Sequence, residues 1–354
     1  MSRDSAPPES DRAANARAPR QTTGLFGHAH AEAGLLAAYR SGKLAQAWLI
    51  GGPEGIGKAT LAWRMARFLL AHPDPQSGSV QSATDLFVPP EHAAARKIAA
   101  ASHGDVFTLR REWNEKTKKH FTEIRADDVR QAIHLFQQAS GEGGWRICIL
   151  DCAEDLNRSS ANALLKMIEE PPPRSLFLII AQKPGQVLPT IRSRCRKLML
   201  AALDQDSIVK AVQAQGPPLS GLPIGQLAQA AARAGGSARE ALRLIDGGSL
   251  AFDRRLQALL GGLPRIDWRA VHALADDVAG RERDEAYETM KRGIFEHLAG
   301  AVRSAAAARA APASLVPLAQ AWDKINGAVR EAEALNLDRR ALVLGIFGDL
   351  AAAG

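Results

Sequence analysis

The chain has 354 residues, 46% of them hydrophobic, and a formal net charge of +7 at pH 7. This length and apolar content are enough for two or three domains, and no apolar run reaches the ~20 residues that a membrane-spanning helix needs. The small positive charge suits a polyanionic partner such as nucleic acid, and it suits an ordinary basic protein equally well.

The first 22 residues do not have the pattern of a signal peptide. They are rich in Ala, Pro, Arg, Asp and Ser and lack an apolar core. We therefore expect a disordered tail at 1–22 and a cytoplasmic protein without membrane contact. A helix is predicted from about 25 to 39, because apolar residues recur there at helical spacing and Gly42 follows. A strand at 47–50 comes next.

The stretch after this strand reads GGPEGIGKAT and has nearly the pattern of a phosphate-binding loop. A helical pattern that runs to about residue 71 follows it. The loop pattern requires Gly, four residues and then Gly-Lys-Ser/Thr. Gly52, Gly57 and Lys58 fit, but Ala59 stands where the hydroxyl belongs. This departure indicates a nucleotide-binding fold whose own catalysis is weakened.

Each part of such a loop has a chemical task. Glycines let backbone amides wrap a phosphate chain, and Lys58 adds a cation. A Ser/Thr hydroxyl would ligate magnesium, which Ala59 cannot do, and Thr60 is turned roughly 100° away on the helix. The nucleotide-binding candidates in the loop are Gly52, Gly55, Gly57, Lys58 and Thr60. Whether ATP or ADP is bound, and whether magnesium accompanies it, stays open.

A loop and a hairpin are predicted after the helix that follows the phosphate-binding loop. Residues 72–90 are rich in Pro, Ser, Gln and Gly, which favours a loop. Two strands, Val106–Arg111 and His120–Ile124, are predicted around a polar turn. The resulting hairpin, residues 105–124, is rich in Arg and Lys, so it either contacts DNA or is an ordinary solvated hairpin.

The strand at 145–151 ends in an acid. Asp151 lies where a phosphate-loop protein places the carboxylate that holds magnesium through water. In hydrolysing proteins of this kind the next residue is usually Glu, which orients the attacking water. Here it is Cys152, and a neutral thiol cannot do that work. Glu154 lies about 6–7 Å further along the strand, too far unless the chain bends.

The cysteines indicate neither a disulfide framework nor a zinc site. Cys148 and Cys152 are four residues apart on one predicted strand, which places them roughly 13 Å from each other, too far to bridge. No CxxC pair is present, so we expect no structural zinc and no other protein-bound metal cluster.

The pattern of strands and helices predicts the fold class. Helices are predicted at 127–136, capped by Asp127 or Asp128, at 159–168, starting at Ser159 or Ser160, and at 188–194; strands are predicted at 176–181 and 197–200. Alternating strands and helices favour a mostly parallel sheet with helices on both faces and a ligand at the carboxyl ends of the strands.

Four parts are expected along the chain. They are a tail at 1–22, an α/β nucleotide-binding-type domain at 23–201, a small helical lid at 202–247 and an all-α domain at 248–354. Within the lid, Ser237 and Glu240 form a capping-box pattern, with Ser237 as the N-cap. The last boundary falls at Gly247-Gly248.

Four stretches together carry a resemblance to a known family. They are Gly51–Thr60, Ile147–Asp155, the string ANALLKMIEEPP at 161–172, and Leu188–Cys195 with its Ser-Arg-Cys end. The chain resembles the bacterial clamp-loader branch of the AAA+ ATPases, over residues 22–246 and more loosely over 321–354. This resemblance implies an AAA+ P-loop domain, a lid, and a helical collar through which subunits oligomerise.

The resemblance also implies roles for single residues. Arg194 corresponds to the family's arginine finger, which reaches the ATP of a neighbouring subunit. Arg239 corresponds to the lid arginine called sensor 2, although its position also fits simple solvent exposure. Gln182 and Lys183 fall near sensor 1, where Thr or Asn is usual. The four zinc cysteines of many family members are missing.

These departures imply a subunit that donates chemistry without performing it. The resemblance implies a stator subunit of the DNA polymerase III clamp loader and a component of the holoenzyme, with no ATPase activity of its own. Its partners would be the other clamp-loader subunits (gamma/tau and delta), the sliding clamp, and primed DNA through the assembly. The alternatives are an active motor ATPase of the gamma/tau type and a purely structural AAA+ scaffold.

Overall fold

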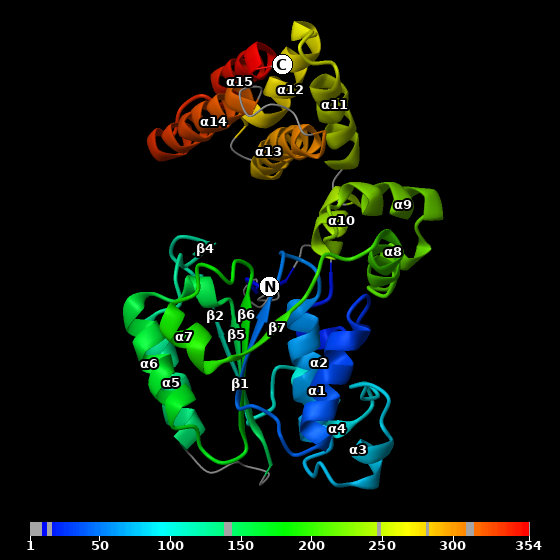
Figure 1. Cartoon of the computed structure of the whole chain (residues 1–354), viewed down its shortest axis with the longest axis vertical. Helices are drawn as coiled ribbons and strands as arrows, with labels where there is room; N and C mark the ends of the chain where they lie inside the picture. Colours follow the sequence, from blue (N-terminus) through cyan, green and yellow to red (C-terminus); the bar gives the residue numbers. More distant parts are fainter. Residues whose placement is uncertain are drawn as a thin grey trace, which may run out of the picture. The chain divides into compact units, whose positions relative to one another are not determined.

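The computed structural model describes residues 9–12, 16–137, 144–245, 249–280, 283–308 and 315–353. The chain divides into two compact units, Met1–Arg243 and Leu244–Gly354 (Figure 1). The finer four-part division stays a prediction. Its boundary at 247–248, and residues 1–8 and 13–15 of the expected tail, lie outside the described residues.

The first unit is built on a five-stranded sheet in the order β2-β5-β6-β1-β7. All the strand pairs in this sheet are parallel, as the sequence predicts. The strands are β1 (Ala47–Gly51), β2 (Val106–Arg110), β5 (Arg146–Asp151), β6 (Ser175–Ala181) and β7 (Arg196–Met199). The three central strands are almost continuous runs of buried apolar residues, which is typical of strands covered on both faces.

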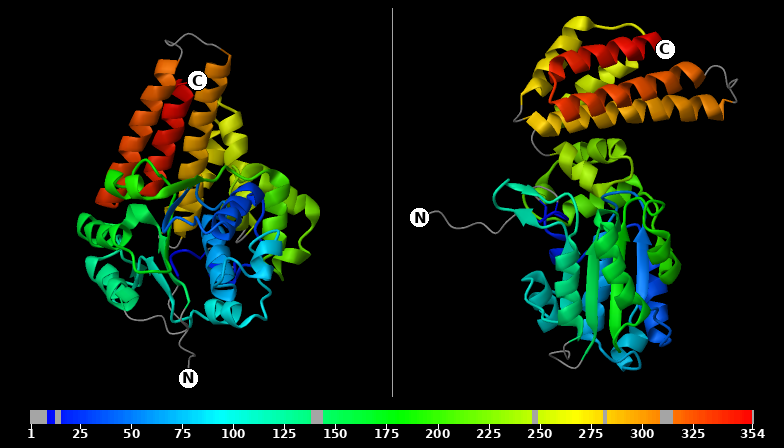
Figure 2. Two further views of the ribbon diagram at one scale, coloured as in Figure 1. Left: turned by 60° about the horizontal axis from the view of Figure 1, so that its bottom comes forward. Right: turned by 90° about the vertical axis from the view of Figure 1, so that its left-hand side faces the viewer.

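Helices cover both faces of this sheet, which confirms the predicted α/β class (Figure 2). One layer contains α1 (Ala29–Arg40), α2 (Lys58–Ala71) and α4 (Ala93–Ala99), and the other contains α5 (Ala126–Gln137), α6 (Arg158–Glu169) and α7 (Pro189–Arg194). The core under α5 and α6 includes Phe136, Leu164 and Phe177, each at most 1% exposed. This packing holds the carboxyl ends of the strands at one edge, where the phosphate loop begins.

The residues before α1 differ from the disordered tail that we expected. Residues 16–22 pack against α2 and α4 through the short 3₁₀ helix η1 (Pro19–Gln21). Ala18 is 1% exposed. The guanidinium of Arg67, buried in α2, donates a hydrogen bond of 2.5 Å to the carbonyl oxygen of Thr22, and burial lowers its pKa to about 10. Small side chains and one buried donor therefore order a segment whose composition indicates disorder.

The predicted pairing of 106–111 with 120–124 is wrong. Residues 106–110 form the edge strand β2, which pairs in parallel with β5. The antiparallel hairpin is much smaller and joins β3 (Trp113–Asn114) to β4 (Lys119–His120). An alternating pattern predicts a strand but not its partner, which explains the error. Whether this hairpin contacts DNA or is an ordinary solvated hairpin stays open.

Two local predictions also need correction. The 72–90 stretch is not all loop, because it contains the one-turn helix α3 (Gly78–Ser82). Helix α6 is capped by Asn157, whose Oδ1 accepts a 2.9 Å hydrogen bond from the amide of Ser160. Asn, like Ser, is a favoured N-cap, so composition alone did not distinguish them.

Short helices follow the sheet, as predicted, and the last of them ends two residues beyond the boundary of the first unit at Arg243. These are α8 (Gln205–Gln213), η3 (Leu219–Gly221), α9 (Ile224–Arg233) and α10 (Ala238–Ile245). The hydroxyl of Ser237 accepts a 3.2 Å hydrogen bond from the amide of Glu240, so Ser237 is the N-cap of α10. We call α8–α10 the lid.

The second unit is all helical over its described residues. It contains α11 (Ser249–Gly261), α12 (Trp268–Ala279), α13 (Asp284–Ala307), α14 (Val316–Leu335) and α15 (Arg339–Ala353). Its core includes Leu256, Val271 and Ile325, each at most 1% exposed. Among the residues that the structure describes, no helix is both long and apolar enough to span a bilayer.

Candidate functional site

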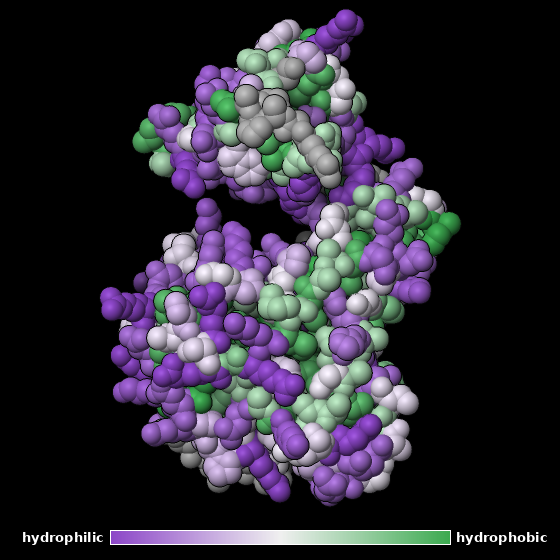
Figure 3. All heavy atoms as spheres, in the orientation of Figure 1, coloured by the Kyte–Doolittle hydropathy of each residue, from purple (hydrophilic) through white to green (hydrophobic). Residues whose placement is uncertain are grey.

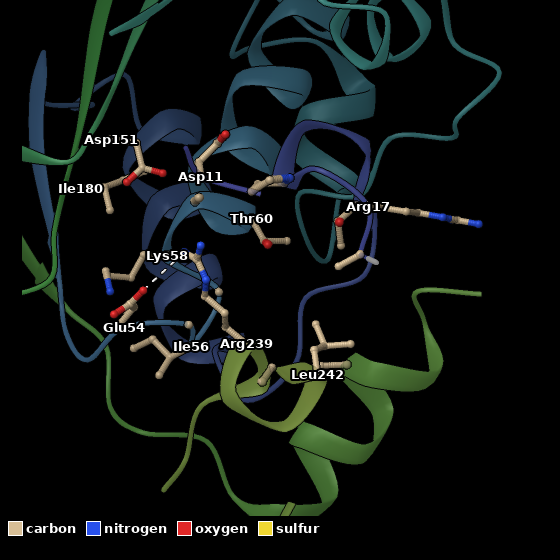
Figure 4. A pocket seen from close by; sticks show the side chains of 18 of the residues that line it. Asp11, Arg17, Glu54, Ile56, Lys58, Thr60, Asp151, Ile180, Arg239 and Leu242 are labelled. Carbon is tan, nitrogen blue, oxygen red and sulfur yellow. Dashed lines mark ion pairs between the residues drawn. The ribbon is translucent and has the colours of Figure 1, made fainter. Parts of the chain in front are cut away.

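A pocket of about 370 Å³ lies at the carboxyl ends of the central strands, between the phosphate loop and the lid (Figure 4). Its wall brings together six of the predicted nucleotide-binding residues: Gly55, Gly57, Lys58, Thr60, Asp151 and Arg239. Gly52 is not part of the wall. The sequence therefore located the pocket, although ligand binding by these residues stays a prediction.

The phosphate loop packs closely against the lid. Gly55 has a φ of +74°, and a Cβ atom there would lie 2.2 Å from the Ser237 hydroxyl, so only glycine fits. The carbonyl oxygen of Gly55 accepts a 3.2 Å hydrogen bond from the Arg239 amide. Gly57, with a φ of +103°, is the N-cap of α2 and directs the amino end of that helix into the pocket.

Lys58 is satisfied within its own loop. Only 5% of this residue is exposed, and its ammonium donates to the carbonyl oxygens of Gly52, at 2.8 Å, and Pro53. Burial lowers the pKa of Lys58, while the charges of Asp151 and Glu54 act in the opposite direction. The cation that would meet a terminal phosphate is therefore turned back onto the backbone.

The magnesium side of the pocket does not fit the ion. Ala59 has no side-chain hydroxyl at the position where the phosphate loop would supply a magnesium ligand. The pKa of Asp151 is raised to about 7, mainly by burial and then by the negative charge of Asp11, with Lys58 and Arg239 opposing. A carboxyl group that tends to be protonated is a poor partner for a divalent cation.

Neither Cys152 nor Glu154 is in a state or position to activate a water molecule. Burial raises the pKa of the Cys152 thiol well above its usual range, so it stays neutral. The chain does bend after Asp151, into the 3₁₀ helix η2 (Ala153–Asp155). This bend directs Glu154 to the amide of Lys183, whose hydrogen bond its Oε1 accepts. The described residues therefore place no carboxylate in the usual water-orienting position.

Arg239 reaches the pocket from α10, as sensor 2 would. Its side chain is 37% exposed, and Nη1 lies 3.4 Å from Oε1 of Glu54, the ion pair drawn in Figure 4. Nη2 also lies 3.5 Å from the carbonyl oxygen of Arg12. The side chain lines the pocket and is also partly solvated, so the sensor 2 role and simple solvent exposure both stay predictions.

Arg194 lies away from this pocket, at the last residue of α7. Its side chain is 41% exposed, and Nε lies 2.6 Å from Oε1 of Glu169 at the end of α6. Nη1 donates a 3.1 Å hydrogen bond to the carbonyl oxygen of Thr190. Figure 3 shows hydrophilic side chains gathered on the part of the surface that α5–α7 form. The guanidinium is thus held at a polar surface and not buried in its own unit.

Sequence reasoning missed the contribution of the N-terminal residues. Asp11 lines the pocket, and its side chain is only 4% exposed. It pairs with Arg110 at the end of β2, at 2.8 Å. Neither residue belongs to a recognisable motif, and a composition typical of disorder hid the segment, so no local signal could have found this contact.

Known proteins similar in sequence to this chain are subunits of DNA polymerase III. A family model described as DNA polymerase III, delta subunit, matches residues 27–204, which is half of the chain. The delta-prime subunit of DNA polymerase III from Pseudomonas aeruginosa is 38% identical over 151 residues, or 43% of this chain and 42% of that protein. The delta-prime subunit from Escherichia coli is 28% identical over 245 residues, or 68% of this chain and 66% of that one.

A gamma/tau subunit from Mycobacterium tuberculosis is 32% identical over 174 residues, or 48% of this chain and 27% of that protein. The match to each of these relatives spans less than two thirds of the relative's own length. The family match nevertheless covers both the phosphate loop and Arg194. This protein therefore belongs to the DNA polymerase III delta-subunit family and is of the delta-prime type.

Proposed function

We propose that this protein is the stator subunit of a DNA polymerase III clamp loader and supplies Arg194 to the ATP of a neighbouring subunit. One contrast carries the proposal. Arg194 is exposed and fixed at a surface, while the chain's own pocket has Ala59 in place of a magnesium ligand and Cys152 in place of an acid. These features suit a subunit that assists ATP hydrolysis in its neighbour and does not hydrolyse ATP in its own pocket.

The contacts of Arg194 suit a group that acts on a neighbour. Glu169 engages Nε and Thr190 engages Nη1, which fixes the plane of the guanidinium. A planar, permanently charged fork can then spread positive charge over phosphoryl oxygens as the transition state forms. Such arginine fingers contribute about 10³–10⁵ in rate.

The remaining parts of the chain have roles consistent with an assembly. The all-helical second unit would form the oligomerising collar, and the first unit would hold one end of an arc of subunits. Its partners would be gamma/tau and delta subunits, with the sliding clamp and primed DNA reached through the assembly. The names of its relatives support this assignment, because they are delta-prime and gamma/tau subunits of DNA polymerase III.

The test is Arg194→Ala in a reconstituted clamp loader in which only the adjacent motor subunit can hydrolyse ATP. We expect the DNA-stimulated ATPase rate to fall by at least about 10³-fold. Arg192→Ala is the matched control, and we expect it to leave this rate nearly unchanged. Full activity of the Arg194→Ala assembly would instead identify a structural scaffold.

A second measurement separates the proposal from an active motor. The purified chain, incubated alone with ATP and magnesium, is expected to show no turnover. Hydrolysis at about 1 s⁻¹ or faster, within the usual enzyme range, would identify a gamma/tau-type ATPase and overturn the stator assignment.

A further inference from the structure

We propose that residues 9–12 form an intramolecular plug that occupies the mouth of the nucleotide-type pocket and excludes nucleotide from it. This inference concerns the chain's own pocket, so it holds or fails independently of the role of Arg194. Four features of the first unit carry it: an anchor that fixes the plug, a tether that positions it, the negative charge that the plug adds to the pocket, and the partners that Lys58 and Arg239 already have without a ligand.

The anchor is Arg110 at the carboxyl end of β2. Its Nη1 lies 2.8 Å from Oδ1 of Asp11, and its Nη2 lies 2.9 Å from Oε1 of Glu9, so one guanidinium holds both acids of the plug. Arg20 pairs with the other oxygen of Glu9. Burial alone would raise the pKa of Glu9, but the hydrogen bonds and charges of Arg110 and Arg20 lower it, so this carboxylate stays ionised.

The tether is the packed segment that follows. Residues 16–22 lie against α2 and α4, and Arg67 binds the backbone of this segment at several carbonyl oxygens. The Nε of Arg12 donates a 2.8 Å hydrogen bond to the carbonyl oxygen of Ala16. Because Arg12 is thus joined to a fixed point, the plug is held close to the pocket even when its acidic anchor opens.

The plug places negative charge where a nucleotide would bring its phosphates. Asp11 lies on the pocket wall with Asp151, and Figure 4 shows the two carboxylates on the same side of the pocket. After burial, which is the main cause, the charge of Asp11 also raises the pKa of Asp151. A polyphosphate entering this space would meet a like charge, which is unfavourable in a partly buried site.

Two of the cations that line the pocket, Lys58 and Arg239, already have partners. The ammonium of Lys58 is turned to the carbonyl oxygens of Gly52 and Pro53, and the guanidinium of Arg239 pairs with Glu54. A nucleotide would therefore have to replace these contacts as well as displace the plug. If the plug is closed about 99% of the time, the apparent affinity for nucleotide falls about 100-fold.

The experiment is equilibrium binding of a fluorescent ATP analogue, without magnesium, to three forms of the chain. These are the full chain, a variant lacking residues 1–12, and a matched control lacking residues 1–8, which keeps the plug. We expect the variant lacking 1–12 to bind at least about 30-fold more tightly than the other two. Lys58→Ala in that variant should abolish the gain, which locates the binding at the phosphate loop.

A full-length double variant, Glu9→Gln with Asp11→Asn, provides a second route that leaves the chain length unchanged. It removes the ionic anchor and is expected to increase affinity in the same direction, with thermal unfolding of every variant confirming that it is folded. Equal affinity of the full chain and both weakened forms overturns the proposal. No binding by the weakened forms overturns it too, because the plug would then not be the barrier. Either result leaves the Arg194 experiment unaffected.

Discussion

Replacing Asp151 by Asn should stabilise this protein, and more so as the pH rises. The folded state raises the pKa of Asp151 to about 7 from an ordinary value of 3.8, mainly through burial. A carboxyl group whose pKa is raised on folding favours the folded state at low pH. That contribution is complete below the unfolded pKa near 4 and is lost as the pH rises through the folded pKa near 7.

The magnitude follows from this difference in pKa. Going from 3.8 to about 7 corresponds to about 4 kcal/mol between the two protonation states. Asp151 is not fully shielded from water, so solvent screening reduces the effect, and we expect about 1–2 kcal/mol at pH 8. Asparagine has nearly the same shape but carries no charge, so it avoids this cost.

The assay is urea unfolding of the wild type and of Asp151→Asn at pH 5, 6, 7 and 8. The difference in unfolding free energy between the two proteins should already be present at pH 5, grow up to about pH 7, and change little between pH 7 and pH 8. A difference that is constant over this range, or that shrinks as the pH rises, would refute the reasoning, because then Asp151 would ionise as readily in the folded chain as in the unfolded one.

Two further predictions concern ion pairs of opposite kinds. Glu169→Gln should lower the Arg194-dependent ATPase rate of the reconstituted assembly about 3–10-fold and leave the KM for ATP unchanged. The melting temperature should also stay the same, since an exposed ion pair contributes at most about 1 kcal/mol to stability. An equal loss of rate in the Glu170→Gln control would contradict a positioning role for Glu169. Glu32→Ala should destabilise the first unit by up to about 3–5 kcal/mol in denaturant unfolding. Arg64 is 6% exposed and 2.7 Å from Glu32, and the substitution leaves it with the half-exposed carboxylate of Asp85, 3.8 Å away. A loss below about 1 kcal/mol would show that water reaches this pair.

Local patterns were sufficient for the phosphate loop and the central strands. Glycines followed by Lys58 and the apolar run at 47–50 act within a few residues, and the structure has the strand and helix where they predict them. Long-range contacts were not accessible in the same way. Neither the pairing of β2 with β5 nor the contact between Asp11 and Arg110, 99 residues apart, leaves a local signature.

The N-terminal segment shows why composition misled. Disorder is expected where too little apolar surface can be buried to offset the loss of chain entropy. Here Ala18 is buried on a preformed helical surface, and Arg67 satisfies backbone carbonyls that would otherwise face water. The information lay in α2, far along the chain, and not in the segment itself.

Arg194 is separated by a single residue from β7, and β7 pairs in parallel with β1, which runs directly into the phosphate loop. Arg194 lies at the amino end of β7, and the phosphate loop follows the carboxyl end of β1. Because the two strands run in the same direction, about 13 Å of hydrogen-bonded backbone separates these two ends. The paired strands keep these two ends apart, so Arg194 does not reach the phosphate loop of its own chain. In the proposed assembly it would instead serve the loop of a neighbouring subunit, and β7 and β1 would connect the two junctions of this chain with its neighbours.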